Sequence, residues 1–218
     1  MNAILSSPTQ LSASLPSILD TPFQGSGRRH NINGFDLRTA DVDRFNGLLA
    51  RLGRTRTPFD ADQLASAARE LCDRSIHDFS PPSIRQRLRR IAAVEQMVGD
   101  AQWEPANDAV DTAQLIVDYA RSRDDLIPDW LPKVGRLDDA IVVDTAWPRL
   151  VAEVEDYLDY VRLRSLEAHR RGCTVTGFEF SRQDWEQARY EEAVYAEHER
   201  QIRESSYLPN SVSVFRVH

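Results

Sequence analysis

The chain has 218 residues, of which 41% are hydrophobic and 28% are charged, so it is long enough for one substantial core or two small ones. Its 9 glycines and 11 prolines exclude a collagen-like chain, and no apolar run approaches the roughly 20 residues of a membrane-spanning helix. The formal net charge is −7. Up to Asp100 there are 13 basic and 11 acidic residues, and after it 14 and 23, which indicates two differently used surfaces.

The start of the chain lacks the basic-then-apolar layout of a secretory signal. The two cysteines, Cys72 and Cys173, lie far apart without the spacing of a metal motif. Such an isolated pair favours buried free thiols over a disulfide. We therefore expect a cytoplasmic protein.

Residues 1–34 are rich in Ser, Pro, Thr, Asn and Gly, and no helical or strand period persists among them. This composition predicts an extended N-terminal arm. A few apolar side chains in it could form a short docking segment: Leu11, Leu15, Ile18 and Leu19.

Apolar residues at helical spacing predict four helices in the first part of the chain, at about 39–52, 60–76, 80–99 and 105–119. Asp60 is placed to cap the second helix. The third is expected to begin with a capping serine followed by proline at the first helical position. Glycines follow or close the first and third helices, as is typical of helix C-termini.

A longer helical region is predicted after the proline-containing segment 126–135, and it is expected to break or kink near Pro148 and to end near Gly172. Ser181 and Asp184 then resemble a capping box that opens a polar helix reaching about residue 203.

Two short segments at the C-terminal end, 173–180 and 212–217, alternate or are β-branched and could pair as a small ribbon. We therefore predict a mainly α protein with a bundle-like domain of six to seven helices and a short C-terminal β-ribbon. The expected parts are the arm (1–34), a helical domain (35–172) and a strand–helix–strand extension (173–218).

One segment, from Asp125 to Asp139, reads DLIPDWLPKVGRLDD and resembles the signature of the YkvA-type family of unknown function, approximately D-L-I-P-D-x-x-P-x-x-G-x-x-D-D. The matching positions are Asp125, Leu126, Ile127, Pro128, Asp129, Pro132, Gly135, Asp138 and Asp139. The resemblance covers about residues 110–143. It implies a helical fold and no established reaction. Membrane association is a common inference for the family, but here Asp144 interrupts the hydrophobic stretch that follows the motif.

The residues themselves predict a connector between two helices. Pro128 and Pro132 each bias the preceding residue towards extended geometry, so the chain cannot run through as one helix. Gly135 permits a conformation closed to other residues, and Asp138 and Asp139 fall in the first turn of the next helix, where negative charge meets exposed N–H groups. Apolar side chains are expected to pack this connector onto the core: Leu126, Ile127, Trp130, Leu131 and Val134.

A second interpretation takes the motif aspartates as ligands of a hard divalent cation, with Asp125, Asp129 and Asp138 as the candidate set. Neighbouring helical positions point about 100° apart, so Asp138 and Asp139 would not share an ion. No basic or glycine-rich phosphate cradle adjoins the motif. We therefore favour structural roles, with Asp129 capping a turn, and expect no cofactor; a divalent metal is the alternative.

Four arginines cluster in the third predicted helix: Arg85, Arg87, Arg89 and Arg90. At helical spacing Arg85 and Arg89 align, whereas Arg87 and Arg90 lie on another flank. With the acidic balance of the chain, this pattern favours a solvated basic face over a nucleic-acid site.

Four aromatic residues are candidates for a protein interface: Trp130, Trp185, Tyr190 and Tyr195. No complete catalytic constellation accompanies them. The sequence therefore favours a non-enzymatic protein that binds a protein partner or itself. The alternatives are a metal-dependent enzyme that acts on a phosphorylated substrate through the motif aspartates, and a peripheral membrane protein.

Overall fold

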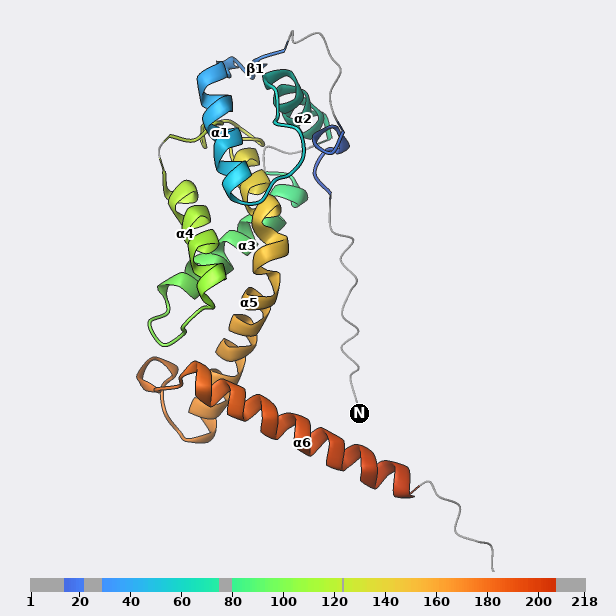
Figure 1. The fold of residues 1–218 in the computed structure, drawn as a ribbon, viewed down its shortest axis with the longest axis vertical. Helices are drawn as coiled ribbons and strands as arrows, with labels where there is room; N and C mark the ends of the chain where they lie inside the picture. Colours follow the sequence, from blue (N-terminus) through green and yellow to red (C-terminus); the bar gives the residue numbers. More distant parts are fainter. Residues whose placement is uncertain (1–13, 22–28, 75–79, 123, 207–218) are drawn as a thin grey trace, which may run out of the picture. The chain divides into compact units, whose positions relative to one another are not determined.

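The computed structural model describes residues 14–21, 29–74, 80–122 and 124–206 (Figure 1). The described residues are mainly helical, which confirms the predicted fold class. Contacts divide the chain into two compact units, described separately below. Unit 1 comprises Met1–Ala101 and Pro105–Glu155, and unit 2 comprises Gln102–Glu104 and Asp156–His218.

Part of the predicted arm is folded within unit 1. Residues Ser17–Leu19 form a 3₁₀ turn, η1, in which Leu19 is buried. The side-chain amide of Gln63 donates to the carbonyls of Ile18 at 2.6 Å and Thr21 at 3.0 Å. Leu15 is half-buried, and Leu11 lies outside the described residues. The expected docking segment is therefore present around Leu19.

A short hairpin follows, formed by β1 (Asn31–Ile32) and β2 (Phe35–Asp36) in antiparallel register. Its turn residues, Asn33 and Gly34, have φ of 49° and 90°, as an Asn-Gly hairpin turn requires. This is the β-ribbon that the described residues contain, and the sequence interpretation had expected no strand there.

The four predicted helices of the first part are all present: α1 (Thr39–Arg51), α2 (Ala61–Arg74), α3 (Pro82–Gly99) and α4 (Asn107–Arg121). The Oδ1 atom of Asp60 accepts a hydrogen bond from the Gln63 N–H at 2.6 Å, which confirms the predicted cap of α2.

The start of α3 differs from the prediction by one residue. Pro82 occupies the first helical position, and Pro81 precedes it with ψ of 150°. A residue before proline is driven into extended geometry, so Pro81 cannot itself be helical. Ser80 is therefore not the capping residue.

Helix α5 (Leu137–Arg170) runs unbroken through Pro148, so of the break or kink predicted there, the break is wrong. A proline inside a helix removes one backbone hydrogen bond. Here Val143, Ala146 and Leu150 are buried on either side of it, and this packing holds the helix together. As predicted, the helix ends near Gly172, which has φ of 67°.

Unit 1 has an apolar core to which all its helices contribute. Figure 1 shows α1 to α4 arranged around the N-terminal half of α5. The Phe45 and Tyr119 rings join α1 to α4, with centroids 5.9 Å apart. The largest buried aliphatic side chains include Leu49, Leu52, Leu64, Ile84, Ile116 and Leu150.

Unit 2 contains the end of α5, the 3₁₀ turn η2 (Val175–Gly177) and α6 (Arg182–Ser206). The strand predicted at 173–180 is wrong. Phe178 and Phe180 are both buried and their rings stack at 5.8 Å, whereas Val175 is exposed, so these apolar residues mark two buried rings and not a paired strand. The second predicted strand, 212–217, lies outside the described residues.

The predicted capping box of α6 is confirmed. The Asp184 carboxylate accepts from the Ser181 N–H at 2.8 Å, and the Ser181 hydroxyl oxygen accepts from the Asp184 N–H at 3.2 Å. The hydrogen bonds from Ser181 hold the pKa of the Asp184 carboxyl below its usual range.

Aromatic side chains form the core of unit 2. The Trp103 ring lies 4.9 Å from Tyr160 and 5.4 Å from Trp185, measured between centroids, and Tyr157 lies at 5.8 Å. The Tyr160 hydroxyl donates to the Phe180 carbonyl at 2.8 Å. These contacts fix the first turns of α6 on the end of α5.

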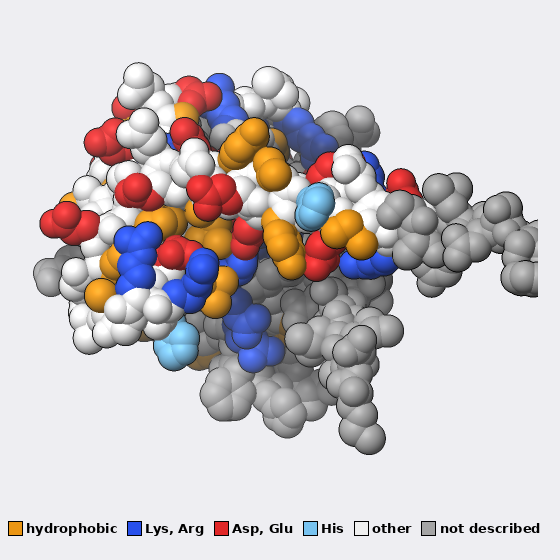
Figure 2. Space-filling view, turned by 90° about the horizontal axis from the view of Figure 1, so that it is seen from below, with side chains coloured by type: hydrophobic (Ala, Val, Ile, Leu, Met, Phe, Trp, Pro, Cys, Tyr) orange, Lys and Arg blue, Asp and Glu red, His pale blue; other side chains and the backbone are white. Residues whose placement is uncertain are grey.

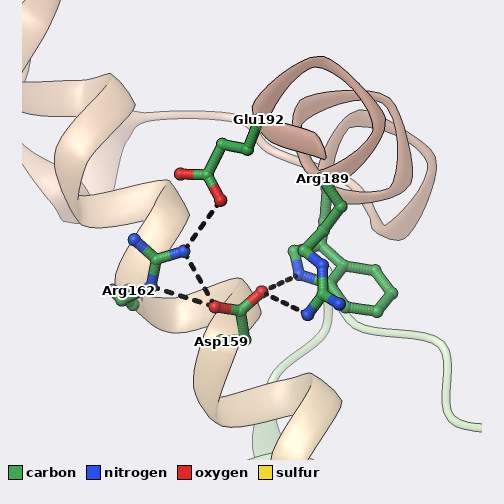
Figure 3. Close-up of polar contacts among 5 residues, drawn as sticks. Asp159, Arg162, Arg189 and Glu192 are labelled. Carbon is green, nitrogen blue, oxygen red and sulfur yellow. Dashed lines mark hydrogen bonds and ion pairs between the residues drawn. The ribbon is translucent and has the colours of Figure 1, made fainter. Parts of the chain in front are cut away.

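One polar network adds to this attachment (Figure 3). The Asp159 carboxylate on α5 accepts from Trp185 Nε1 at 3.0 Å, from Arg189 at 3.0 Å and from Arg162 at 2.9 Å, and Arg162 also reaches Glu192 at 3.2 Å. Burial opposes ionisation of Asp159, but the hydrogen bonds from Trp185, Arg189 and Arg162 outweigh it and lower the pKa of this carboxyl.

Both cysteines are free, with Cys72 half-buried and Cys173 exposed. Within the described ranges, no helix is both long and apolar enough to cross a membrane.

The Asp159 network gives a direct test of how α6 is held. We expect Asp159→Asn to lower the free energy of unfolding by roughly 1–2 kcal/mol, because one carboxylate serves three donors and two of these are partly exposed arginines. Urea unfolding followed by tryptophan fluorescence measures the change. Asp156→Asn, on the same helix, is the control, and an equal loss in both variants would contradict the assigned role.

Candidate functional site

The motif segment up to Arg136 forms a non-helical connector between α4 and α5, and its last three residues begin α5, as predicted. Its turns are closed by backbone bonds from the Leu131 N–H to the Pro128 carbonyl at 3.0 Å and from the Val134 N–H to the Pro132 carbonyl at 2.8 Å. The aliphatic side chains at 126, 127, 131 and 134 are buried. Trp130, however, is 72% exposed and does not pack onto the core.

Asp138 is the most enclosed of the motif aspartates, with 0% of its surface exposed. Its Oδ2 accepts from the Tyr119 hydroxyl at 2.7 Å and from the Ile127 N–H at 3.0 Å. The Tyr119 oxygen in turn accepts from the Leu126 N–H at 3.2 Å. Asp138 therefore ties the connector to both α4 and α5.

Asp139 and Asp129 share a different partner, Arg136. The Arg136 Nε lies 2.7 Å from Asp139 Oδ2, and its Nη1 lies 2.8 Å from Asp129 Oδ2. Asp129, which was expected to cap a turn, is instead an ion-pair partner. Arg136 and Tyr119 were both missed by the sequence interpretation, because no pattern marks them as partners of the aspartates.

The buried carboxyls titrate far from their usual range. Burial raises the pKa of Asp138 to about 7, and the charge of Asp139 contributes to the rise. Burial also raises the pKa of Asp139 to about 6, although Arg136 opposes it. Burial raises the pKa of Asp125 as well, with a contribution from Asp129. The Oδ1 atoms of Asp138 and Asp139 are buried without a hydrogen-bond partner in the described part of the chain.

The structure does not assemble the candidate metal ligands Asp125, Asp129 and Asp138 into one site. Among the described residues, no group of three or more His, Cys, Asp or Glu side chains could hold a metal ion. Between Asp129 and Asp139 lies the guanidinium of Arg136, which supplies the positive charge there. Asp138 directs its bonded oxygen to Tyr119 and the connector backbone.

Gly135 is required for a reason other than the predicted one. The left-handed residue of the connector is Lys133, with φ of 69°. At Gly135 a Cβ atom would lie 2.5 Å from the Asp129 carbonyl oxygen and 2.8 Å from that of Pro128. Glycine is therefore needed because the connector backbone passes too close for any side chain.

The arginines of α3 divide as their spacing predicted, but not all are solvated. Arg87 is 8% exposed and lies with its Nε 3.1 Å from Asp144 Oδ1, while Arg90 Nη1 lies 3.0 Å from the same oxygen. Arg85 and Arg89 are exposed. Asp144, which interrupts the hydrophobic stretch after the motif, thus joins α3 to α5 through these ion pairs.

The candidate interface aromatics separate into two groups. Trp185 is 6% exposed and belongs to the core of unit 2, so its assignment to an exposed interface is corrected. Tyr190 and Tyr195 are 66% and 65% exposed. Every residue from Arg189 to Glu204 is exposed, including Val194 and Ile202, which the sequence interpretation had not singled out. Figure 2 shows a face on which hydrophobic side chains lie between acidic ones.

Comparison with protein-family models, with curated proteins and with solved structures gives no match for this chain. The similarity of 125–139 to the YkvA-type signature therefore stays a prediction from the sequence.

The tight passage at Gly135 can be tested by adding one methyl group. We expect Gly135→Ala to lower the free energy of unfolding by about 1–3 kcal/mol, because the Cβ would overlap connector carbonyls. Gly47→Ala is the matched control: nothing lies within 4 Å of its Cβ position in α1, and alanine there should stabilise the helix by up to about 1 kcal/mol. Urea denaturation measures both, and a neutral Gly135→Ala would contradict the assigned close approach.

The raised pKa values predict an unusual pH dependence. Because the folded-state pKa of Asp138 lies above the ordinary value of about 3.9, the folded protein binds protons more tightly than the unfolded one. The contribution to stability is therefore full below about pH 4 and falls as the pH rises through about 7.

Asp138→Asn should reduce the slope of the free energy of unfolding against pH by up to about 1.4 kcal/mol per pH unit. The amide oxygen can still accept from Tyr119 and Ile127, but the side chain no longer titrates. Unfolding by urea at a series of pH values measures the slope. Asp111→Asn, at an exposed site on α4, should leave it unchanged. A variant slope equal to that of the parent would show that Asp138 does not titrate in this window.

Proposed function

We propose that the protein is a non-enzymatic binding module and that the exposed part of α6 is its binding surface. The observation that carries this proposal is the exposure of four large apolar side chains on one solvent-exposed stretch of helix: Tyr190, Val194, Tyr195 and Ile202.

The helicity of this stretch has an explanation that requires no partner. Arg200 pairs with Glu197 and Glu204, and Arg203 pairs with Glu199, at helical spacings of three and four residues. Such pairs stabilise a polar helix in water. They do not account for tyrosine and isoleucine side chains in solvent, and aromatic residues of this kind are the usual anchors of protein interfaces.

The charge of α6 indicates the chemistry of the partner. The helix carries seven acidic residues against four arginines, so its apolar side chains are framed by negative charge. Two copies of the same acidic surface would repel each other, whereas a partner with a basic and apolar surface would be attracted. The proposal therefore favours a different, basic protein, with self-association as the second form.

The other two functions receive less support. An enzyme that uses a metal at the motif aspartates would need them to converge, yet Arg136 and Tyr119 engage them in other contacts. A peripheral membrane protein would need a basic amphipathic surface, and α6 is acidic. A binding role also agrees with the predicted YkvA-type resemblance, which implies no established reaction, and with the predicted cytoplasmic location.

The proposal is tested with the full chain and the double variant Tyr190→Ser/Tyr195→Ser. We expect a basic protein, captured from native lysate and quantified by mass spectrometry, to be recovered at least tenfold less with the variant. Val110→Ser, which changes an exposed apolar residue on α4, should retain it. Circular dichroism verifies that both variants keep their helix content.

Sedimentation velocity of the parent and the double variant tests the second form. A dimer that the double substitution dissociates would assign the surface to self-association. A monomeric parent that captures the same proteins as the double variant would overturn the proposal.

A further inference from the structure

A pocket of about 370 Å³ lies in unit 1, bordered by residues 14–15 and 19–20, the loop between α1 and α2, Arg87 of α3, and the N-terminal part of α5. Its volume is in the range of small-molecule sites. Its apolar lining consists of Leu15, Leu19, Phe59, Ile141 and Pro148. Three hydroxyl groups also line it, from Ser14, Thr55 and Thr145.

Arg54 is the central cation of this pocket. Its guanidinium lies over the Phe59 ring at 3.7 Å from the centroid, and Nη2 donates to the Thr57 carbonyl at 3.3 Å. Its Nε is buried without a hydrogen-bond partner in the part of the chain that the structure describes. Burial, together with the neighbouring charge of Arg56, lowers the pKa of Arg54. This group is a half-buried cation held by an aromatic ring and a carbonyl.

The carboxylates at the pocket are already engaged by other arginines. Asp144 is within 3.1 Å of both Arg87 and Arg90. Asp20 pairs with Arg56, but both side chains are more than half exposed, so this pair adds little stability. Among the described residues at or beside the pocket, positive charge therefore exceeds negative charge. The four guanidinium groups belong to Arg54, Arg56, Arg87 and Arg90, and the two carboxylates to Asp20 and Asp144.

We propose that this pocket binds the phosphate monoester group of a small soluble molecule, with the phosphate at Arg54 and Arg56 and the organic part against Leu15, Phe59 and Pro148. A phosphate monoester carries a charge of about −1.5 to −2 at neutral pH, which matches the excess of positive charge. Guanidinium groups donate two parallel hydrogen bonds to such oxyanions, and the hydroxyls of Ser14 and Thr55 supply further donors, whereas the Thr145 hydroxyl already donates to the Ile141 carbonyl at 2.8 Å. The site does not depend on the function proposed for α6.

Titration calorimetry with the full chain, in phosphate-free buffer at physiological ionic strength, tests the proposal. The probes are phenyl phosphate, inorganic phosphate and phenol. We expect phenyl phosphate to bind more tightly than inorganic phosphate, because the apolar lining residues add contact with the phenyl ring, and we expect phenol not to bind. No heat of binding from either phosphate compound at millimolar concentration would overturn the proposal.

Three variants decide whether Arg54 binds the phosphate group. Arg54→Gln should weaken phenyl phosphate binding at least tenfold, and Arg89→Gln, an exposed arginine of α3 outside the pocket, should stay within twofold of the parent. Arg54→Lys keeps the charge over Phe59 and should fold normally while still binding several-fold more weakly than the parent. Equal weakening by Arg54→Gln and Arg89→Gln would mean binding to net charge and would overturn the site.

A phosphate group could also come from a lipid. This alternative is tested with vesicles that contain phosphatidic acid. Co-sedimentation measures how much of the parent protein and of Arg54→Gln binds to them. We expect no binding to the vesicles. Binding to vesicles that needs Arg54, without binding of phenyl phosphate, would assign the site to a lipid headgroup and overturn the small-molecule form.

Discussion

The path of the chain between α4 and α5 depends on one buried carboxylate oxygen, Asp138 Oδ2. It accepts from a side chain of α4 and from the connector backbone while its own residue lies in the first turn of α5. Without it, the buried Ile127 N–H and the Tyr119 hydroxyl would lose their acceptor, and unsatisfied buried donors are costly. The aliphatic residues of the connector can then pack inward, and the passage is so close that position 135 must be glycine. The Asp138 oxygen without a partner is the cost of this arrangement.

Local signals in the sequence were sufficient for most of the fold. Helices α1 to α4, the cap by Asp60 and the capping box at Ser181 depend on residues close in sequence, and all were predicted. The hairpin had a local signal too, the Asn33-Gly34 pair, which was overlooked within a polar segment. The continuity of α5 through Pro148 and the turn around Val175 could not be predicted, because packing partners far along the chain decide them.

For the candidate sites too, local patterns in the sequence could not predict which side chains are buried or which partners they contact. Trp185 and Tyr190 are aromatic residues five positions apart on α6, yet one lies in an aromatic core and the other in solvent. Arg87 and Arg89 differ in the same way, because only Arg87 meets Asp144. The motif aspartates were correctly placed in a connector and a first helical turn, but their partners, Tyr119 and Arg136, are specified by the folded structure. The pocket around Arg54 has no sequence pattern at all.

The exposure of α6 beyond Arg189 also governs how this part of the molecule opens. Every residue from Arg189 to Glu204 is exposed, so beyond the Arg162–Glu192 ion pair the last turns of the helix can unwind at a cost well below that of global unfolding. Backbone amides there would exchange with solvent quickly, and trypsin would reach Arg200 and Arg203 before it cut either core. A molecule bound along the helix would slow both amide exchange and cleavage, so either rate would report whether this part of α6 is bound.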